Sequence, residues 1–216
     1  MTELLDPTRL VRLETQILEH LQGHAPEFLT ASTARSTRAA GDAIENIVSA
    51  ALPGLLSDLT GSWVEDLSRR AMADARIQTA SGSVYDIDIK THQIGTKFSR
   101  SNLISWRRLA KFYERPENTF LIVLVSYEVT GHDVAFKACR AFPIEWLSWE
   151  TLSLGLLGWG QIQFTNTRSF QEVTGNSRSA WMTEMCDRLL DFYPNEVAKI
   201  QDRIAFARKI RERWAP

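Results

Sequence analysis

The chain has 216 residues, of which 44% are hydrophobic and 10% aromatic, with seven tryptophans. This composition is typical of a folded globular protein and excludes a disordered or fibrous one. The longest apolar run, residues 120–125, is far shorter than the roughly 20 residues that a membrane helix needs, so no membrane partner is expected. The first residues show no basic-then-apolar export leader, and the two cysteines make no disulfide framework, so a cytoplasmic protein is expected.

The net charge of −1 comes from 25 Lys and Arg against 26 Asp and Glu. A protein that binds nucleic acid by charge alone would be clearly basic, so the total disfavours one. Basic residues nevertheless cluster within residues 97–111 and 199–213. A neutral total is compatible with an enzyme that discriminates between nucleic-acid sequences, because its non-specific affinity for phosphates stays low.

A single domain over residues 1–216 is predicted, with a helical N-terminal part, 1–62, a core, 63–145, and a C-terminal part, 146–216. Residues 4–22 and 42–60 have the spacing of apolar positions that indicates helices, and Pro53 should kink or divide the second one.

The middle and end of the chain alternate between strand and helix patterns. The predicted elements are strands at 76–79, 84–90, 119–127 and 134–142, and helices at 101–113, 179–192 and 195–214. The polar, glycine-containing residues 80–83 form the turn between the first two strands. The predicted fold is therefore α/β, with a short mixed central β-sheet flanked by helices.

Acidic and basic side chains alternate with apolar ones along residues 84–90. Because alternate residues of a strand share a face, Asp86, Asp88 and Lys90 project to one side and the apolar residues between them to the other. A three-residue loop at 80–82 would place Asp74 opposite Asp88, and Arg76 opposite Asp86. Asp86 is then more simply a cross-strand partner of Arg76 than a metal ligand.

Two facing carboxylates repel each other unless a cation lies between them or one of them is protonated. Asp74 and Asp88 offer the oxygen ligands that Mg²⁺ prefers, with open positions for water and a phosphate. Lys90 would lie beside that water, where it can position it or neutralise charge on the phosphorus. The alternative interpretation is a solvated strand face with an ordinary ion pair. A D-x-K tripeptide alone has little specificity. The strand, the turn and the preceding acid around it favour the catalytic site over the solvated strand face.

Asp74, a spacer of thirteen residues and Asp88-Ile89-Lys90 resemble the PD-(D/E)XK motif of a nuclease superfamily. Ala73 stands where that family has a proline, and residues 41–45, ending in Glu45, resemble its helix with an accessory glutamate. The motif and the following Ser-Asn-Leu-Ile-Ser look most similar to type II restriction endonucleases of the EcoRV/HincII-like branch. The resemblance implies a restriction-endonuclease-like fold in which 63–145 is the catalytic core and 146–216 the recognition and C-terminal helical part.

The resemblance also implies the chemistry. Asp74, Asp88 and the carbonyl of Ile89 would bind Mg²⁺, which Mn²⁺ can replace, while Lys90 positions water and Glu45 assists. The products of double-stranded DNA hydrolysis would be a 5′-phosphate and a 3′-hydroxyl. A two-fold homodimer matches a palindromic site by symmetry, and the cell would contain a cognate DNA methyltransferase that is not a bound partner.

Two further groups of polar residues are candidates for DNA contact. Lys97, Arg100, Ser101 and Asn102 lie between the catalytic strand and the next helix, where the alternative role for Ser101 or Asn102 is that of a helix N-cap. Gln161, Gln163, Asn166 and Arg168 are candidates for reading bases, with a plain surface loop as the alternative.

Two other functions fit the same residues. A repair or recombination nuclease could use the same core on a junction or lesion, although a more basic surface would then be expected. A non-catalytic DNA-binding protein would keep the fold without turnover, and the intact acid–acid–lysine set disfavours it.

Overall fold

The computed structural model describes residues 3–28, 37–58, 60–64, 72–97, 101–130, 133–155, 160–165 and 167–215. Among these residues, no helix is both long enough and apolar enough to cross a membrane.

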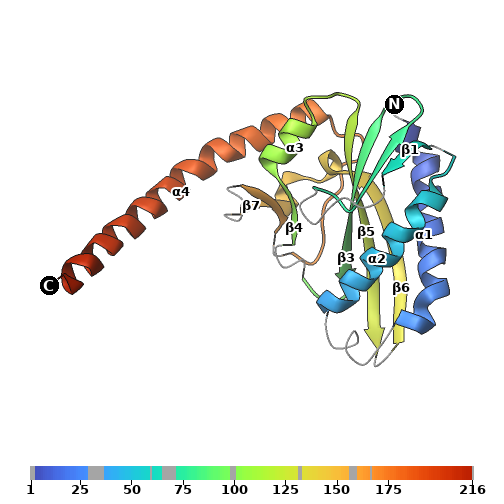
Figure 1. Cartoon of the computed structure of the whole chain (residues 1–216), viewed down its shortest axis with the longest axis horizontal. Coiled ribbons are helices and arrows are strands. Elements are labelled where there is room, and N and C mark those ends of the chain that lie inside the picture. Colours follow the sequence, from blue (N-terminus) through green and yellow to red (C-terminus); the bar gives the residue numbers. More distant parts are fainter. Residues whose placement is uncertain are drawn as a thin grey trace.

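A five-stranded mixed sheet forms the centre of the fold (Figure 1). Its strands, in spatial order, are β1 (Thr60–Val64), β2 (Ala75–Thr79), β3 (Val84–Gln93), β5 (Asn118–Thr130) and β6 (Asp133–Pro143). β3 and β5 run parallel, and the other neighbours are antiparallel. The continuous apolar run of β5 is buried on both faces because layers cover both sides of the sheet. The predicted α/β class with a mixed central sheet and flanking helices is confirmed.

Two helices pack on one face of this sheet. After a short 3-10 turn (Glu3–Leu5), α1 (Pro7–Phe28) packs chiefly against β6 and α2 (Thr37–Leu55) against β3. Their apolar side chains share one core with Ile87 and Ile89 of β3. The predicted division of the second helix at Pro53 is wrong. Pro53 lies two residues before the end of α2, so few helical hydrogen bonds follow it, and the buried Leu52 and Leu56 hold both sides of it on the core.

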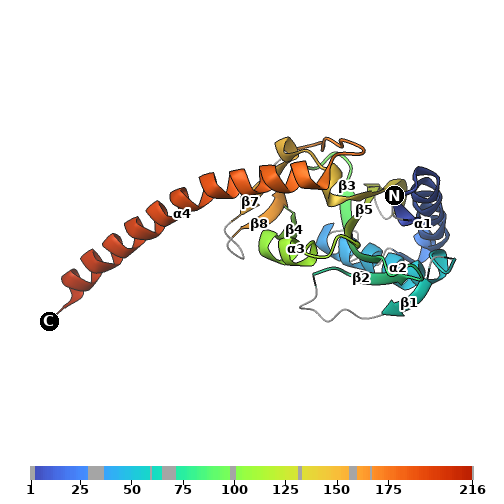
Figure 2. The same cartoon turned by 90° about the horizontal axis from the view of Figure 1, so that it is seen from above.

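A second, three-stranded sheet and two helices lie on the opposite face (Figure 2). Its order is β4 (Asn102–Ser105), β8 (Gln161–Phe164) and β7 (Leu152–Gly155), and 3-10 turns at Ile144–Trp146 and Trp149–Thr151 precede β7. The helix predicted over 101–113 is corrected here, since its first residues form β4 and only Trp106–Phe112 form α3. Leu103 and Ile104 are consecutive residues and both are buried. This is compatible with a strand that is covered on both faces, and Ile104 pairs with Ile162 of β8.

The chain ends in one long helix, α4 (Arg178–Trp214). Two helices were predicted, and that prediction is wrong because α4 continues through Pro194. Contacts on both sides of the proline keep the helix in line: the Trp106 indole donates to the Tyr193 hydroxyl at 2.7 Å, and Glu196 is buried. The first half of α4 packs through Trp181, Met185 and Leu189 on the second core, while its second half extends away from the rest of the fold (Figure 1).

Candidate active site

The β2–β3 hairpin fixes the position of the motif. Its pairing places Arg76 opposite Asp86 and Ala75 opposite Ile87. Asp74 directly precedes β2, and its N–H donates to the Ile87 carbonyl at 3.0 Å. The loop closes as predicted at 80–82, with Gly82 at φ 89, a conformation that costs glycine little. The predicted pairing of Arg76 with Asp86 is therefore confirmed, whereas Asp74 lies one residue before the paired part of the hairpin.

The acids and the lysine of the motif contact one another. The Asp74 Oδ2 atom accepts a hydrogen bond from the Ile89 N–H at 2.6 Å, and Lys90 Nζ lies 2.7 Å from Asp88 Oδ1. The side chain of Asp88 is only 7% exposed, and that of Lys90 is 22% exposed. The backbone of β3 thus holds both acids and the lysine in one partly buried cluster.

Glu45 joins this cluster from α2. Its carboxyl group hydrogen-bonds that of Asp74 and senses the charge of Lys90. The helix can approach β3 this closely because Gly41, one turn before Glu45, has no side chain. A Cβ atom there would lie 2.8 Å from Thr91 Oγ1. Glu45, Asp74, Asp88 and Lys90 therefore form what we call the acid–lysine cluster.

Burial and mutual repulsion determine the protonation of the acid–lysine cluster. Burial raises the pKa of Asp88 to about 7, opposed by the charge of Lys90 and reinforced by that of Asp74. Burial and the charge of Asp74 raise the pKa of Glu45 to about 7 as well. For Lys90, burial lowers the pKa, but the neighbouring carboxylates raise it more, and the net shift is upward. Lys90 therefore keeps its proton at neutral pH, while the two acids are poised to lose theirs.

The donor set fits a divalent cation. Asp88 Oδ2 is buried and has no hydrogen-bond partner within the described part of the chain, although a buried carboxylate oxygen is normally satisfied. In a β-strand the N–H and C=O of one residue point to the same edge of the strand. Since the Ile89 N–H donates to Asp74, which precedes β2, the Ile89 carbonyl points toward Asp74 as well. No group of three or more His, Cys, Asp or Glu in the described ranges has the arrangement of a metal centre. Mg²⁺ does not require one, because it binds to one or two carboxylates plus waters and substrate phosphate.

Asp86 shares the strand face of Asp88 but has a different partner. Arg76 forms a two-point ion pair with it, with donor–acceptor distances of 2.5 and 2.7 Å. The predicted cross-strand pair is confirmed, and Asp86 is already neutralised. This makes Asp86 a matched control for experiments on Asp88.

Replacing Gly41 with alanine should move α2 away from β3. The new methyl group would meet Thr91 Oγ1, and we expect a loss of about 1–3 kcal/mol in the free energy of unfolding, typical of overpacking. In a Thr91→Ala background the same substitution should stabilise the protein, because alanine favours the helix over glycine. Urea unfolding of the four proteins measures this difference. Equal effects of Gly41→Ala in both backgrounds would show that the contact does not set the position of α2.

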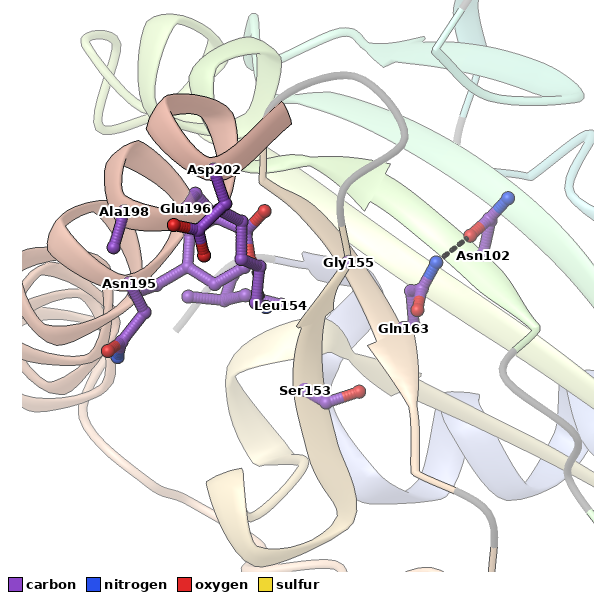
Figure 3. Close-up of a pocket in the computed structure, with 11 residues that line it drawn as sticks. Asn102, Ser153, Leu154, Gly155, Gln163, Asn195, Glu196, Ala198 and Asp202 are labelled. Atoms are coloured by element: carbon purple, nitrogen blue, oxygen red, sulfur yellow. Dashed lines mark hydrogen bonds and ion pairs between the residues drawn. The ribbon is translucent and has the colours of Figure 1, made fainter. Parts of the chain in front are cut away.

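The structure brings some of the predicted DNA contacts together. Gln163 Nε2 donates to Asn102 Oδ1 at 2.6 Å, from the neighbouring strands β8 and β4 (Figure 3). The pair lines an open hollow of about 940 Å³ between the second sheet and α4, with Glu196 and Asp202 on the helix side. Gln163 is buried and lies so close to Gly155 that a Cβ there would collide with it. These two amides are therefore held in place before any ligand binds.

The other candidate contacts are not part of this hydrogen-bonded pair. Lys97 is exposed in the turn after β3, and Arg168 is exposed after β8. Gln161 begins β8 opposite Ser105. The Ser101 carbonyl accepts from the Phe164 N–H at 3.1 Å. Because α3 begins at Trp106, neither Ser101 nor Asn102 caps it, and that alternative is wrong. Arg100 and Asn166 lie outside the described residues.

A basic groove was not predicted from the sequence. It has a volume of about 700 Å³ and lies between β2 and α3, lined by Arg76, Arg108, Lys111 and Arg115. Arg76 places it on the sheet face that Asp86 and Asp88 share. The basic run at 97–111 was a usable signal, but the helix boundary had to be known before these side chains could be placed on one surface. Such a groove can contact phosphates along a DNA strand.

Neither the models of known protein families nor the curated proteins give a match to this chain. The resemblance to PD-(D/E)XK nucleases therefore remains a prediction, and the chemistry of the acid–lysine cluster depends on the contacts described above.

Proposed function

We propose that this protein is a type II restriction endonuclease, a Mg²⁺-dependent enzyme that hydrolyses phosphodiester bonds of double-stranded DNA at a specific sequence. The observation that supports it most strongly is the buried Asp88 Oδ2 beside Lys90, for which the described residues supply no hydrogen-bond partner. A stable fold does not bury an orphaned carboxylate oxygen without reason. In the working enzyme, a bound cation would be the partner of that oxygen.

Asp74 and Asp88 would hold the ion through carboxylate oxygens, with the Ile89 carbonyl as a third protein ligand. Mg²⁺, when bound, supplies a Lewis acid at the scissile phosphate, and Mn²⁺ can take its place. Glu45 shares a hydrogen bond with Asp74, so it orients that ligand and buffers the charge of the site.

Lys90 acts through its positive charge. Its raised pKa keeps it protonated, which argues against a role as general base. An ammonium group donates hydrogen bonds and has no acceptor, so it can hold the attacking water and neutralise charge that develops on the phosphate oxygens. Hydrolysis with water as the attacking group and the 3′ oxygen as the leaving group yields a 5′-phosphate and a 3′-hydroxyl.

The basic groove supplies the means to position DNA beside this cluster. Phosphate contacts fix the register of a protein on the duplex, whereas base contacts select the sequence. Arg108, Lys111 and Arg115 serve the first role. The Asn102–Gln163 pair serves the second, because amide side chains can form two hydrogen bonds with adenine. Two copies related by a two-fold axis would cut both strands of a palindrome.

Incubation of the purified chain with a long duplex of known sequence tests this function. With Mg²⁺ we expect a reproducible set of fragments carrying 5′-phosphates, and with EDTA none. A smear of fragments would keep the catalytic cluster but replace sequence recognition with the repair or recombination alternative. Binding without cleavage, under Mg²⁺ or Mn²⁺ and on many sequences, would contradict the enzyme and favour the non-catalytic DNA-binding alternative.

A further inference from the structure

From Leu190 onward, α4 exposes large apolar side chains. The exposed fractions are 72% for Leu190, 52% for Val197, 46% for Ile204 and 78% for Trp214. The helix leaves the body of the protein there (Figures 1 and 2). Clustered exposed apolar side chains on a protein mark surfaces that bind a partner.

These side chains repeat every seven residues. Leu190, Val197 and Ile204 are spaced by seven, and a second series of Tyr193, Ile200, Ala207 and Trp214 follows it three residues later. Two apolar positions per heptad define the contact stripe of a coiled coil, because a 3.5-residue repeat keeps them facing one partner helix. We call the seven residues of these two series the α4 seam. Its fit to a heptad indicates that the partner is another helix.

The charges of α4 indicate that the partner helix is a second copy of α4 in antiparallel orientation. Residues 184–202 contain five acidic and two basic side chains, and residues 203–214 contain five basic and one acidic. Two parallel copies would place the basic halves side by side. Two antiparallel copies place each basic half along the acidic half of the other, which is favourable electrostatically.

We propose that a second copy of this chain binds along the α4 seam in antiparallel orientation. The heptad register that pairs six of the seven seam residues puts Leu190 against the partner's Trp214, Val197 against the partner's Ala207, and Ile200 against the partner's Ile204. The seventh, Tyr193, then lies against the partner's Arg211. The two most exposed of these side chains thus cover each other. Such a pairing is a two-fold symmetric interface.

This interface would hold together the homodimer of the proposed function. The interface itself, however, is inferred only from the sequence and exposure of α4. Sedimentation of the full chain, without DNA or metal, should show a dimer. Ile204→Glu should weaken the dimer by at least about 30-fold, the effect of losing a central apolar contact. Phe206→Glu is the matched control, since Phe206 is 65% exposed on the same helix but outside the seam, and this variant should remain dimeric.

Cysteine crosslinking tests the orientation. Cys186, the exposed native cysteine, is first replaced by serine, whereas Cys139 is buried and stays. Leu190→Cys together with Trp214→Cys should then give a covalent dimer on oxidation, and Trp214→Cys alone should not. A dimer crosslinked by Trp214→Cys alone would overturn the antiparallel arrangement.

Three other outcomes would overturn the dimer itself: a wild-type monomer at every concentration, equal weakening by Ile204→Glu and Phe206→Glu, or a monomer that binds duplex DNA through Arg208 and Arg211. A dimer without any nuclease activity would leave this interface standing and contradict only the proposed function. The two failures are therefore distinguishable.

Discussion

Replacing Asp88 with asparagine should lower the rate of Mg²⁺-dependent DNA cleavage by at least about 10³-fold, because a metal ligand contributes several kcal/mol to stabilisation of the transition state. Asparagine keeps the shape of the side chain but removes its charge. Asp88 Oδ2, which accepts no hydrogen bond from any described residue, is the atom that we assign to the metal. Lys90→Met should cause a loss of the same order by removing the ammonium group that contacts Asp88.

The control is Asp86→Asn, which makes the same chemical change on the same strand face. Asp86 is bound by Arg76 and lies outside the acid–lysine cluster, so this variant should retain cleavage provided that it is folded, which a thermal melt checks. Single-turnover rates on one duplex give the comparison. Similar losses for Asp86→Asn and Asp88→Asn, or an active Asp88→Asn enzyme, would show that the cluster is not the catalytic site.

The stability of the metal-free protein should fall as the pH rises from about 4 to about 7. Burial raises the pKa of Asp88 from 3.8 to about 7, so the folded state binds more protons than the unfolded state within this range. The stability that neutral Asp88 contributes is complete below the lower value and lost above the higher one, a difference of about 4 kcal/mol. Mg²⁺ should restore stability at about pH 8 and have little effect at about pH 5, where Asp88 and Glu45 hold protons.

Urea unfolding as a function of pH measures this loss, with and without Mg²⁺. The decline should be shallower in Asp88→Asn, which has no proton to lose at that position, and Mg²⁺ should stabilise this variant much less. Identical pH slopes for the wild type and Asp88→Asn would contradict the raised pKa. Stabilisation of both proteins by Mg²⁺ to the same extent would place the ion elsewhere.

The hairpin and its register could be predicted from the sequence because both depend on local information. Strand alternation sets the faces of Asp86, Asp88 and Lys90, and a short turn containing Gly82 sets which residues pair. No long-range contact is needed to bring Asp74, the residue before β2, close to Asp88. The position of Glu45 is different, since it depends on how closely α2 approaches β3, and that in turn depends on Gly41 meeting Thr91.

Tertiary contacts also explain the wrong element boundaries. The sequence of residues 102–105 fits a helical pattern, but these residues pair with β8, which follows almost 60 residues later in the chain. Pro194 suggested a break, but contacts of Tyr193 and Glu196 hold α4 together across it. The basic groove depends on both α3 and β2, so it could not be assembled from one stretch of sequence.

Binding of Mn²⁺ followed by electron paramagnetic resonance tests the central claim most directly, because it detects the ion at the acid–lysine cluster without requiring the correct DNA sequence. At about pH 8, where the acids have lost their protons, the wild type and Asp86→Asn should bind Mn²⁺ alike, and Asp88→Asn should bind it much more weakly. Equal binding by all three proteins, or none by the wild type, would contradict a metal site at Asp74 and Asp88.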